Sequence, residues 1–122
     1  MEVLYLKLFD SELKVMKVLW ERGDLSAGQL ARILKENIGW NRNTTYTVIK
    51  KCIDKGAIER YEPNFMCRAI ISREQVQQYE TLKLIDKMFD GSVENFFSAF
   101  LSTRKLSAED ITKLKQIVDD LK

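Results

Sequence analysis

Residues 41–52 have the sequence Asn41-Arg42-Asn43-Thr44-Thr45-Tyr46-Thr47-Val48-Ile49-Lys50-Lys51-Cys52. The early turns of this predicted helix carry amides, hydroxyls and one guanidinium where surface carboxylates would normally stand, and such side chains bind base edges and phosphates. The helix should continue to Lys55 and stop at Gly56, a residue that favours helix ends. Its length of about 20 Å, at roughly 1.5 Å per residue, would suit one segment of a DNA major groove.

Two shorter amphipathic segments precede this helix. The first is a predicted helix from Ser11 to Glu21, with Asp10 or Ser11 as its N-cap. The second begins at a capping box formed by Ser26 and Gln29 and should fade near Gly39. The third helix therefore occupies the position of the recognition helix in a helix-turn-helix.

A hairpin pattern follows the third helix. Residues 57–61 and 65–71 alternate in polarity around the turn at residues 62–64, which predicts two short antiparallel strands. Such a hairpin is the wing of a winged helix-turn-helix. Its turn is short, and Arg60 and Arg68 are its best candidates for contacts with a nucleic-acid backbone.

The third helix should have a buried and an exposed side. The predicted inward set contains Tyr46 or Thr45, Val48 or Ile49, and Cys52 and Ile53. This arrangement leaves outside the six polar and basic side chains Arg42, Asn43, Thr44, Thr47, Lys50 and Lys51.

The formal charge of the 122-residue chain is only +2, but its basic residues are unevenly distributed. Residues 1–75 hold 13 Lys and Arg against 10 Asp and Glu, whereas residues 76–122 hold 7 against 8. In residues 41–60, five basic residues, Lys55 among them, face only Asp54 and Glu59. A charge run of this kind is usually a solvated helix face, so charge alone does not establish nucleic-acid binding.

Composition and length indicate one compact domain, or one domain with an arm. Apolar residues make up 45% and charged residues 31%, as in globular proteins with a packed core. No run approaches the roughly 18 apolar residues of a membrane span, and the first nine residues lack the features of a signal peptide. We expect a cytoplasmic protein without a membrane partner.

The chain has no histidine, and Cys52 and Cys67 are its only cysteines. Without histidine, His-based acid–base catalysis, the Ser-His-Asp and Cys-His arrangements and the commonest zinc ligand are all excluded. A Gly-rich phosphate loop and a cofactor fingerprint are also absent from the sequence. We therefore expect no enzymatic activity, no cofactor and no metal site, and interpret both cysteines as small core side chains.

Residues 73–122 have the pattern of three amphipathic helices. Ser72 caps the first, which should run from Arg73 to about Asp90, and Ser92 and Ser107 cap the other two. A segment of this size rarely builds an adequate core alone, so its apolar faces should be buried against a second copy of the chain. The alternative is that these helices fold back on the N-terminal domain. The predicted dimerisation set is Tyr79, Ile85, Phe89, Phe96, Phe97, Phe100, Leu101, Ile111, Leu114 and Ile117.

The fold class that follows is mainly α with a small β-hairpin. Residues 1–72 would form a winged helix-turn-helix DNA-binding domain, and residues 73–122 a helical dimerisation domain.

Several runs of residues together point to a family. They are Asp10-Ser11-Glu12-Leu13-Lys14-Val15-Met16-Lys17-Val18-Leu19-Trp20, Trp40 with Asn43-Thr44-Thr45-Tyr46-Thr47, Lys55-Gly56-Ala57-Ile58, Phe89-Asp90-Gly91-Ser92 and Leu106-Ser107-Ala108-Glu109-Asp110-Ile111. With these runs the chain resembles, from about Phe9 to the C-terminus, the penicillinase-repressor family. These are winged-helix repressors of beta-lactamase and methicillin-resistance operons, with copper-responsive relatives.

The resemblance implies a homodimer that binds a palindromic operator and blocks transcription, with the recognition helix, about residues 43–55, in the major groove. By position, Asn43, Thr44 and Thr47 would meet bases or adjacent phosphates, and Lys51 a phosphate or a base. The other residues are added to the DNA-binding set because they are basic and are expected on an exposed surface. The full predicted DNA-binding set is Arg42, Asn43, Thr44, Thr47, Lys50, Lys51, Arg60 and Arg68.

Three positions depart from the family pattern. Antibiotic-responsive members are induced by cleavage of an Asn-Phe bond in the dimerisation helix, and the pair at this position is Ala99-Phe100. We keep this pair as a candidate induction site for a sensor-protease pathway, although it lacks the Asn of the family's cleavage bond. No cysteine follows Cys67, so the metal sensing of the copper-responsive members is not expected. The position of Asn43 is often Lys in the family, which leaves the operator sequence open.

The sequence thus predicts a dimeric transcriptional repressor with double-stranded DNA and a second copy of itself as partners. The alternative is a winged-helix module that binds a protein partner and no DNA, which the weak net charge keeps open.

Overall fold

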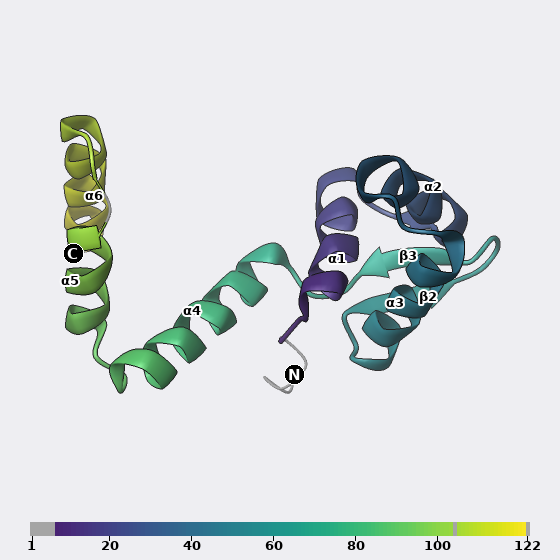
Figure 1. The fold of residues 1–122 in the computed structure, drawn as a ribbon, viewed down its shortest axis with the longest axis horizontal. Helices are drawn as coiled ribbons and strands as arrows, with labels where there is room; N and C mark the ends of the chain where they lie inside the picture. Colours follow the sequence, from purple (N-terminus) through teal and green to yellow (C-terminus); the bar gives the residue numbers. More distant parts are fainter. Residues whose placement is uncertain (1–6, 104, 122) are drawn as a thin grey trace. The chain divides into compact units, whose positions relative to one another are not determined.

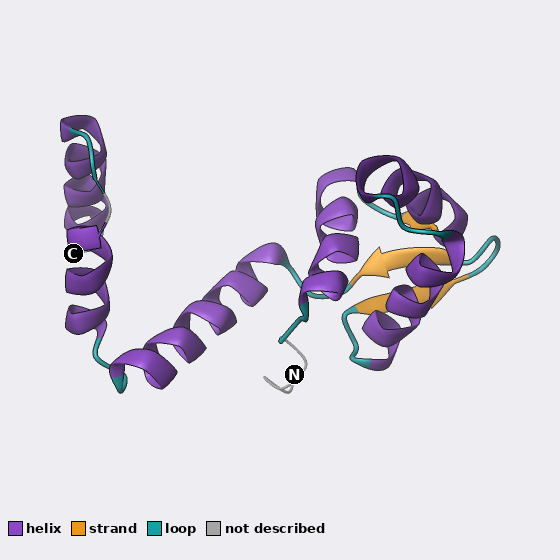
Figure 2. Cartoon of the chain, in the orientation of Figure 1, coloured by secondary structure: helices purple, strands orange, loops and turns teal. Residues whose placement is uncertain are grey.

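The computed structural model describes residues 7–103 and 105–121 and contains mostly helices (Figures 1 and 2). The elements in chain order are α1 (Asp10–Arg22), β1 (Leu25–Ser26), α2 (Ala27–Ile38), α3 (Arg42–Asp54), β2 (Ile58–Tyr61), β3 (Met66–Ala69), α4 (Arg73–Phe89), α5 (Val93–Thr103) and α6 (Ala108–Asp120). The chain forms two compact units, residues 1–81 and residues 82–122, and α4 runs from the first into the second. The predicted boundary after Ser72 stays a prediction.

The first unit is a winged helix, as the sequence predicts. Helices α1 and α2 both pack against α3, and the hairpin β2–β3 follows α3 (Figure 1). The sheet is antiparallel in the order β1-β3-β2, with Ile58 opposite Ala69 and Leu25 opposite Cys67. The third strand, β1, was not foreseen, because two residues are too few to show an alternating pattern.

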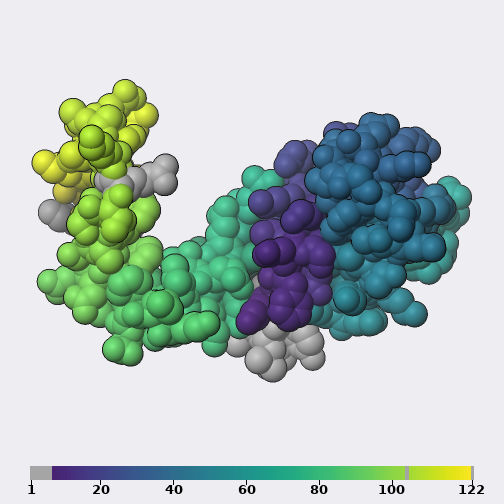
Figure 3. Space-filling model, viewed as in Figure 1, coloured from purple at the N-terminus to yellow at the C-terminus, as the bar shows by residue number. Residues whose placement is uncertain are grey.

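The core of this unit lies between the three helices and the sheet. In the space-filling view the first unit presents a closed surface over α1, α2 and α3, which covers this core (Figure 3). Its fully buried members include Met16, Leu30, Ile49, Ile58 and Ile71. Val76 at the start of α4 belongs to the same cluster, so this end of α4 is part of the first unit.

The start of α1 differs from the prediction. Its N-cap is Phe9, and Asp10 and Ser11 both lie inside the helix, so the expected Asp10 or Ser11 cap is wrong. The Phe9 backbone N–H donates to Glu12 Oε1 at 2.8 Å. Glu12 thus satisfies the amide of the N-cap residue from within the helix, which is the half of a capping box that needs no polar side chain at the N-cap.

The other predicted helix starts are confirmed. Gln29 N donates to Ser26 Oγ at 3.1 Å and Ser26 N donates to Gln29 Oε1 at 2.8 Å, which is a complete capping box. Ser72, Ser92 and Ser107 accept the corresponding bonds at α4, α5 and α6.

The second unit is much less buried than the first. None of the described residues of α5 or α6 is buried, although large apolar side chains recur along both helices. Phe96 packs edge-on against Phe89 and Phe97, with ring centroids 5.7 and 5.1 Å apart, and stacks on Phe100. Nowhere in residues 7–103 and 105–121 is a helix long and apolar enough to cross a bilayer.

Candidate nucleic-acid interface

Helix α3 begins at a polar N-cap. The Thr44 backbone N–H donates to Asn41 Oδ1 at 2.8 Å, and Asn41 itself has extended backbone angles. Gly39 ends α2 with a φ of 75°, a left-handed conformation that glycine adopts without steric cost. The two residues between Gly39 and Arg42 therefore make the tight turn that brings α3 across α2.

The predicted inward set of α3 is resolved by the structure. Val48 and Ile49 are both buried, and Thr45 is fully buried whereas Tyr46 is half-buried. Cys52 is buried as predicted. The Thr45 hydroxyl has no hydrogen-bond partner among the described residues, which is costly for a buried polar group.

The opposite side of α3 carries the predicted base-contacting residues. Asn43 and Thr47 are exposed and Thr44 is half-buried. An amide can donate and accept at the edge of adenine, and a threonine can contact a thymine methyl. From Arg42 to Cys52 the helix contains no acidic residue, and the only carboxylate of α3 is that of the exposed Asp54 in its last turn. The first three turns of this face therefore carry no negative charge that would repel a phosphate backbone.

The two lysines of this face are also exposed. In the part of the chain that the structure describes, Lys50 and Lys51 have no carboxylate within ion-pair distance. Both ammonium groups are therefore available for an anionic partner.

Lys55 serves a different purpose from the lysines of the exposed face. Its Nζ lies 2.5 Å from Oε1 of the buried Glu12, donates to the Lys7 carbonyl at 3.1 Å and lies 4.3 Å from the centre of the Phe9 ring. The charge of Lys55 is thus neutralised inside the first unit. This ion pair joins the end of α3 to the start of α1. The count of basic residues in residues 41–60 therefore overstates the positive charge that is free at the surface.

Arg42, in the first turn of α3, is held by a neutral group. Its Nη2 donates to the Tyr46 hydroxyl at 2.7 Å, and the guanidinium carbon lies 4.7 Å from the centre of the Tyr46 ring. The two residues are four apart, the spacing at which helix side chains meet. Tyr46 was not among the predicted site residues, although this spacing could have suggested it.

The arginines of the wing have acidic partners. Arg60 Nε lies 2.6 Å from Glu62 Oε2, and the Arg60 guanidinium stacks 3.6 Å from the centre of the Phe65 ring. The pKa of the Glu62 carboxyl is lowered, first by the hydrogen bond from Arg60 and then by the bond from the Phe65 amide.

Arg68 is shared between two carboxylates. Its Nε lies 3.3 Å from Asp24 Oδ2 and its Nη1 lies 3.3 Å from Glu59 Oε1. The Tyr61 hydroxyl donates to the same Asp24 oxygen at 2.8 Å, and this bond raises the pKa of Tyr61. Both wing arginines are exposed, but their charge is partly balanced by neighbours that the sequence pattern did not connect to them.

Both cysteines lie in the core, as the sequence predicts. Burial raises the pKa of the Cys52 thiol to about 12 and that of Cys67 to about 11. At neutral pH both thiols are protonated and poor nucleophiles.

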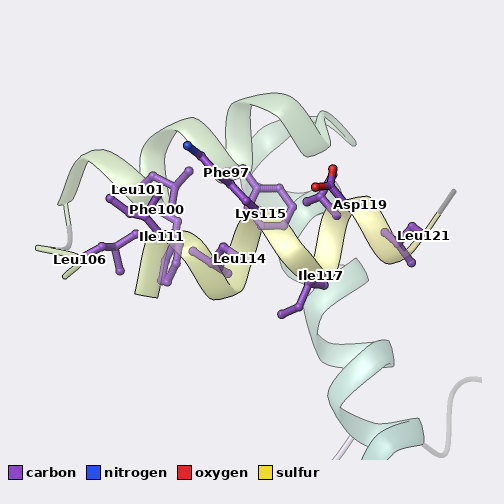
Figure 4. A pocket seen from close by; sticks show the side chains of 11 residues that line it. Phe97, Phe100, Leu101, Leu106, Ile111, Leu114, Lys115, Ile117, Asp119 and Leu121 are labelled. Atoms are coloured by element: carbon purple, nitrogen blue, oxygen red, sulfur yellow. The ribbon is translucent and has the colours of Figure 1, made fainter. Parts of the chain in front are cut away.

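The predicted dimerisation residues fall into two groups. Tyr79 packs on the core of the first unit, Ile85 is buried, and Phe89 and Phe96 are half-buried. The remaining members are exposed on α5 and α6, where a groove of about 940 Å³ opens between the two helices (Figure 4). Its lining consists of Phe97, Phe100, Leu101, Leu106, Ile111, Leu114, Lys115, Ile117, Val118, Asp119 and Leu121.

The Ala99-Phe100 pair lies within α5. The hydroxyls of Ser102 and Thr103 both donate to the Ala99 carbonyl at 3.1 Å. This peptide bond is therefore helical and its carbonyl is engaged.

The fold and this surface together define a winged-helix protein with a polar recognition helix that carries no acidic residue from Arg42 to Ile53. A family comparison agrees: the profile of the penicillinase repressor family matches residues 8–120. The chain belongs to the penicillinase repressor family. This is a family of repressors, and on that ground the prediction of a non-enzyme is confirmed.

Two relatives and one solved structure show how far the similarity extends. The penicillinase repressor of Bacillus licheniformis is 25% identical over 118 residues, covering 95% of this chain and 92% of the relative. The methicillin resistance regulatory protein MecI of Staphylococcus aureus is 22% identical over 115 residues, covering 93% and 94%. The solution structure of the DNA-binding domain of the repressor BlaI matches with a TM-score of 0.53 and 25% identity, covering 57% of this chain and 87% of that one.

Proposed function

We propose that this protein is a DNA-binding transcriptional repressor that acts as a homodimer on a palindromic operator. The observation that carries the proposal is the exposed face of α3, which from Arg42 to Lys51 presents amides, hydroxyls and cations and no carboxylate. Family membership and the likeness to a DNA-binding domain support it.

Within α3 the exposed side chains divide into two roles. Asn43, Thr44 and Thr47 would contact base edges and so select the operator, because their groups match those edges. Lys50 and Lys51 would bind phosphates and contribute affinity with little sequence preference. Arg60 and Arg68 of the wing are a further pair of phosphate contacts, weakened by the carboxylates beside them.

The second unit would supply the dimer. The apolar groove lies between two helices that have no buried residue, and exposed apolar surface of this kind is typical of an interface. A second copy of the chain would bury the apolar faces of both α5 and α6. A two-fold dimer places two recognition helices on half-sites about 34–36 Å apart or a multiple of this distance.

The Ala99-Phe100 pair is the candidate target of a sensor-protease pathway. A protease must bind an extended substrate, so cleavage would require local unfolding of α5 around this bond. Mass spectrometry of the chain from cells treated with a beta-lactam would detect the two fragments, and an intact chain under induction would exclude this route.

The proposal is tested by binding the purified protein to labelled duplexes from the region upstream of its own gene. We expect a cooperative shift, with log affinity falling against log salt by about 0.9 for each phosphate neutralised. Salt-independent binding, or no binding to any upstream duplex, would refute the proposal. Stoichiometric capture of a single protein by a chain that ignores DNA would favour the alternative, a protein-binding module.

A further inference from the structure

Arg42 has a different environment from the wing arginines. Arg60 and Arg68 are each paired with carboxylates, whereas Arg42 donates to the neutral hydroxyl of Tyr46 at 2.7 Å. Among the described residues no carboxylate lies within ion-pair distance of Arg42. Its guanidinium is therefore fixed in place without loss of its positive charge.

Tyr46 is itself held by the scaffold. It packs half-buried against the core, and its ring meets the Phe65 ring edge-on with centroids 5.7 Å apart and planes at 86°. Phe65 is fixed in turn, because its carbonyl accepts from the Ala27 N–H at 2.9 Å and Arg60 stacks on its ring. The position of the Tyr46 hydroxyl is thus set by α3, α2 and the wing together.

We infer that Tyr46 is a positioning residue that holds the Arg42 guanidinium at the first turn of α3 as a preorganised anchor for a phosphate of the DNA backbone. The inference rests on the proposed function. One of the five N–H donors of Arg42 is used on Tyr46, which leaves the others for the two oxygens of a phosphate. Ordering the side chain before binding removes a cost that a free surface arginine incurs on contact.

The test is a double-mutant cycle with Tyr46→Phe and Arg42→Ala. Phosphate contacts do not depend on sequence, so a fluorescein-labelled duplex of roughly 30 mixed base pairs serves as the probe. Tyr46→Phe removes only the hydroxyl and should weaken binding by about threefold to tenfold. Arg42→Ala should weaken it further and lower the salt slope by about 0.9. In the Arg42→Ala background, Tyr46→Phe should have no further effect.

Lys51→Ala is the matched control for the cycle. Lys51 lies on the same helix, and within residues 7–103 no hydrogen bond or cation–π contact joins it to Tyr46, so Tyr46→Phe and Lys51→Ala should combine additively. Equal effects of Tyr46→Phe with and without Arg42, or no effect on the wild-type protein, would overturn the inference while leaving the proposed function standing. A wild-type protein that binds neither this duplex nor upstream DNA would overturn both.

Discussion

At the scale of single residues, Glu12 shows how one buried side chain can serve two elements. Its Oε1 accepts from the Phe9 amide and lies 2.5 Å from Lys55 Nζ, while the residue is only 1% exposed. A buried charge of this kind is tolerated only when it is paired and hydrogen-bonded. The start of α1 and the end of α3 therefore depend on the same carboxylate.

Glu12→Ala should lower the free energy of unfolding by about 2–4 kcal/mol, because it removes the cap of α1 and leaves Lys55 without its counter-ion. Urea denaturation followed by circular dichroism measures the change. Glu21→Ala, on the exposed side of the same helix, is the control and should stay within about 0.5 kcal/mol of wild type. Equal losses of unfolding free energy in the two variants would show that the Glu12–Lys55 ion pair does not stabilise the fold.

The thiols predict a loss of stability at alkaline pH. In the folded protein the pKa is about 12 for Cys52 and about 11 for Cys67, both above the ordinary value of 9.0. Above pH 9 the unfolded chain loses thiol protons that the folded chain keeps, so the stability present below pH 9 falls as the pH rises towards these values. Thermal midpoints should decline more steeply between pH 9 and 11 in wild type than in a Cys52→Ala, Cys67→Ala variant. If the thermal midpoints of the two proteins declined in parallel, the loss of stability could not be assigned to the two thiols.

At the scale of elements, the two arginines of the wing pair with two carboxylates of the wing, Glu59 and Glu62, and with Asp24 from the segment before β1. The Arg60–Glu62 pair is exposed, with side chains 48% and 59% accessible, so it contributes little to stability. If Arg60 binds a phosphate as proposed, we expect the pair to affect DNA binding more than stability, because a carboxylate beside the arginine offsets part of the attraction.

Glu62→Gln should therefore strengthen DNA binding at low salt and raise the salt slope by up to about 0.9, because Arg60 becomes free for a phosphate. The amide oxygen of Gln can still accept from the Phe65 amide, which keeps the turn closed. Fluorescence anisotropy over a salt series provides the measurement. The gain in affinity should vanish when Arg60→Ala is added. Glu21→Gln, which removes the same charge elsewhere, should produce a smaller gain. Equal gains for Glu62→Gln and Glu21→Gln would mean that only the net charge of the protein matters.

At the scale of the whole molecule, the two units differ in composition and burial, and we expect them to have different functions. The basic excess lies in residues 1–75, which include α3 and the wing, whereas residues 76–122 are slightly acidic. The first unit buries a continuous core, and the second leaves most of its large apolar side chains accessible. Binding to DNA and self-association are thus expected to separate under mutation.

Phe100→Asp should turn the dimer into a monomer, because it places a charge in the apolar groove of the second unit. Light scattering should then report the 14.3 kDa of one chain instead of twice that mass. Cooperative binding to a two-half-site duplex should be lost, while weak binding to a single half-site remains. Ile70→Asp, which changes an exposed apolar residue of the first unit, is the control and should stay dimeric. A wild-type monomer would refute the proposed assembly.

Much of this architecture could be predicted from the sequence, because local signals suffice for it. The Ser26 and Ser72 caps and the glycines after α2 and α3 account for the starts of α2 and α4 and for the ends of α2 and α3, whereas the start of α1 was predicted with the wrong cap. The polar face of α3, with no acidic residue from Arg42 to Ile53, is equally local. These features depend on neighbours within one or two turns of the chain.

Other features depended on contacts between residues distant in sequence. Pairing of β1 with β3, the union of Glu12 with Lys55 and the sharing of Arg68 between Asp24 and Glu59 each join segments that no periodicity connects. In the sequence, Lys55 and Arg68 both count as free positive charges. The tertiary structure shows that the charge of Lys55 is neutralised by Glu12 and that the charge of Arg68 is partly balanced by Asp24 and Glu59. The sequence by itself therefore determined the helices, the wing and the polar face of α3. Tertiary structure decided which charges on and near that face remain available, because an ion pair forms only where folding brings its partners within a few ångströms.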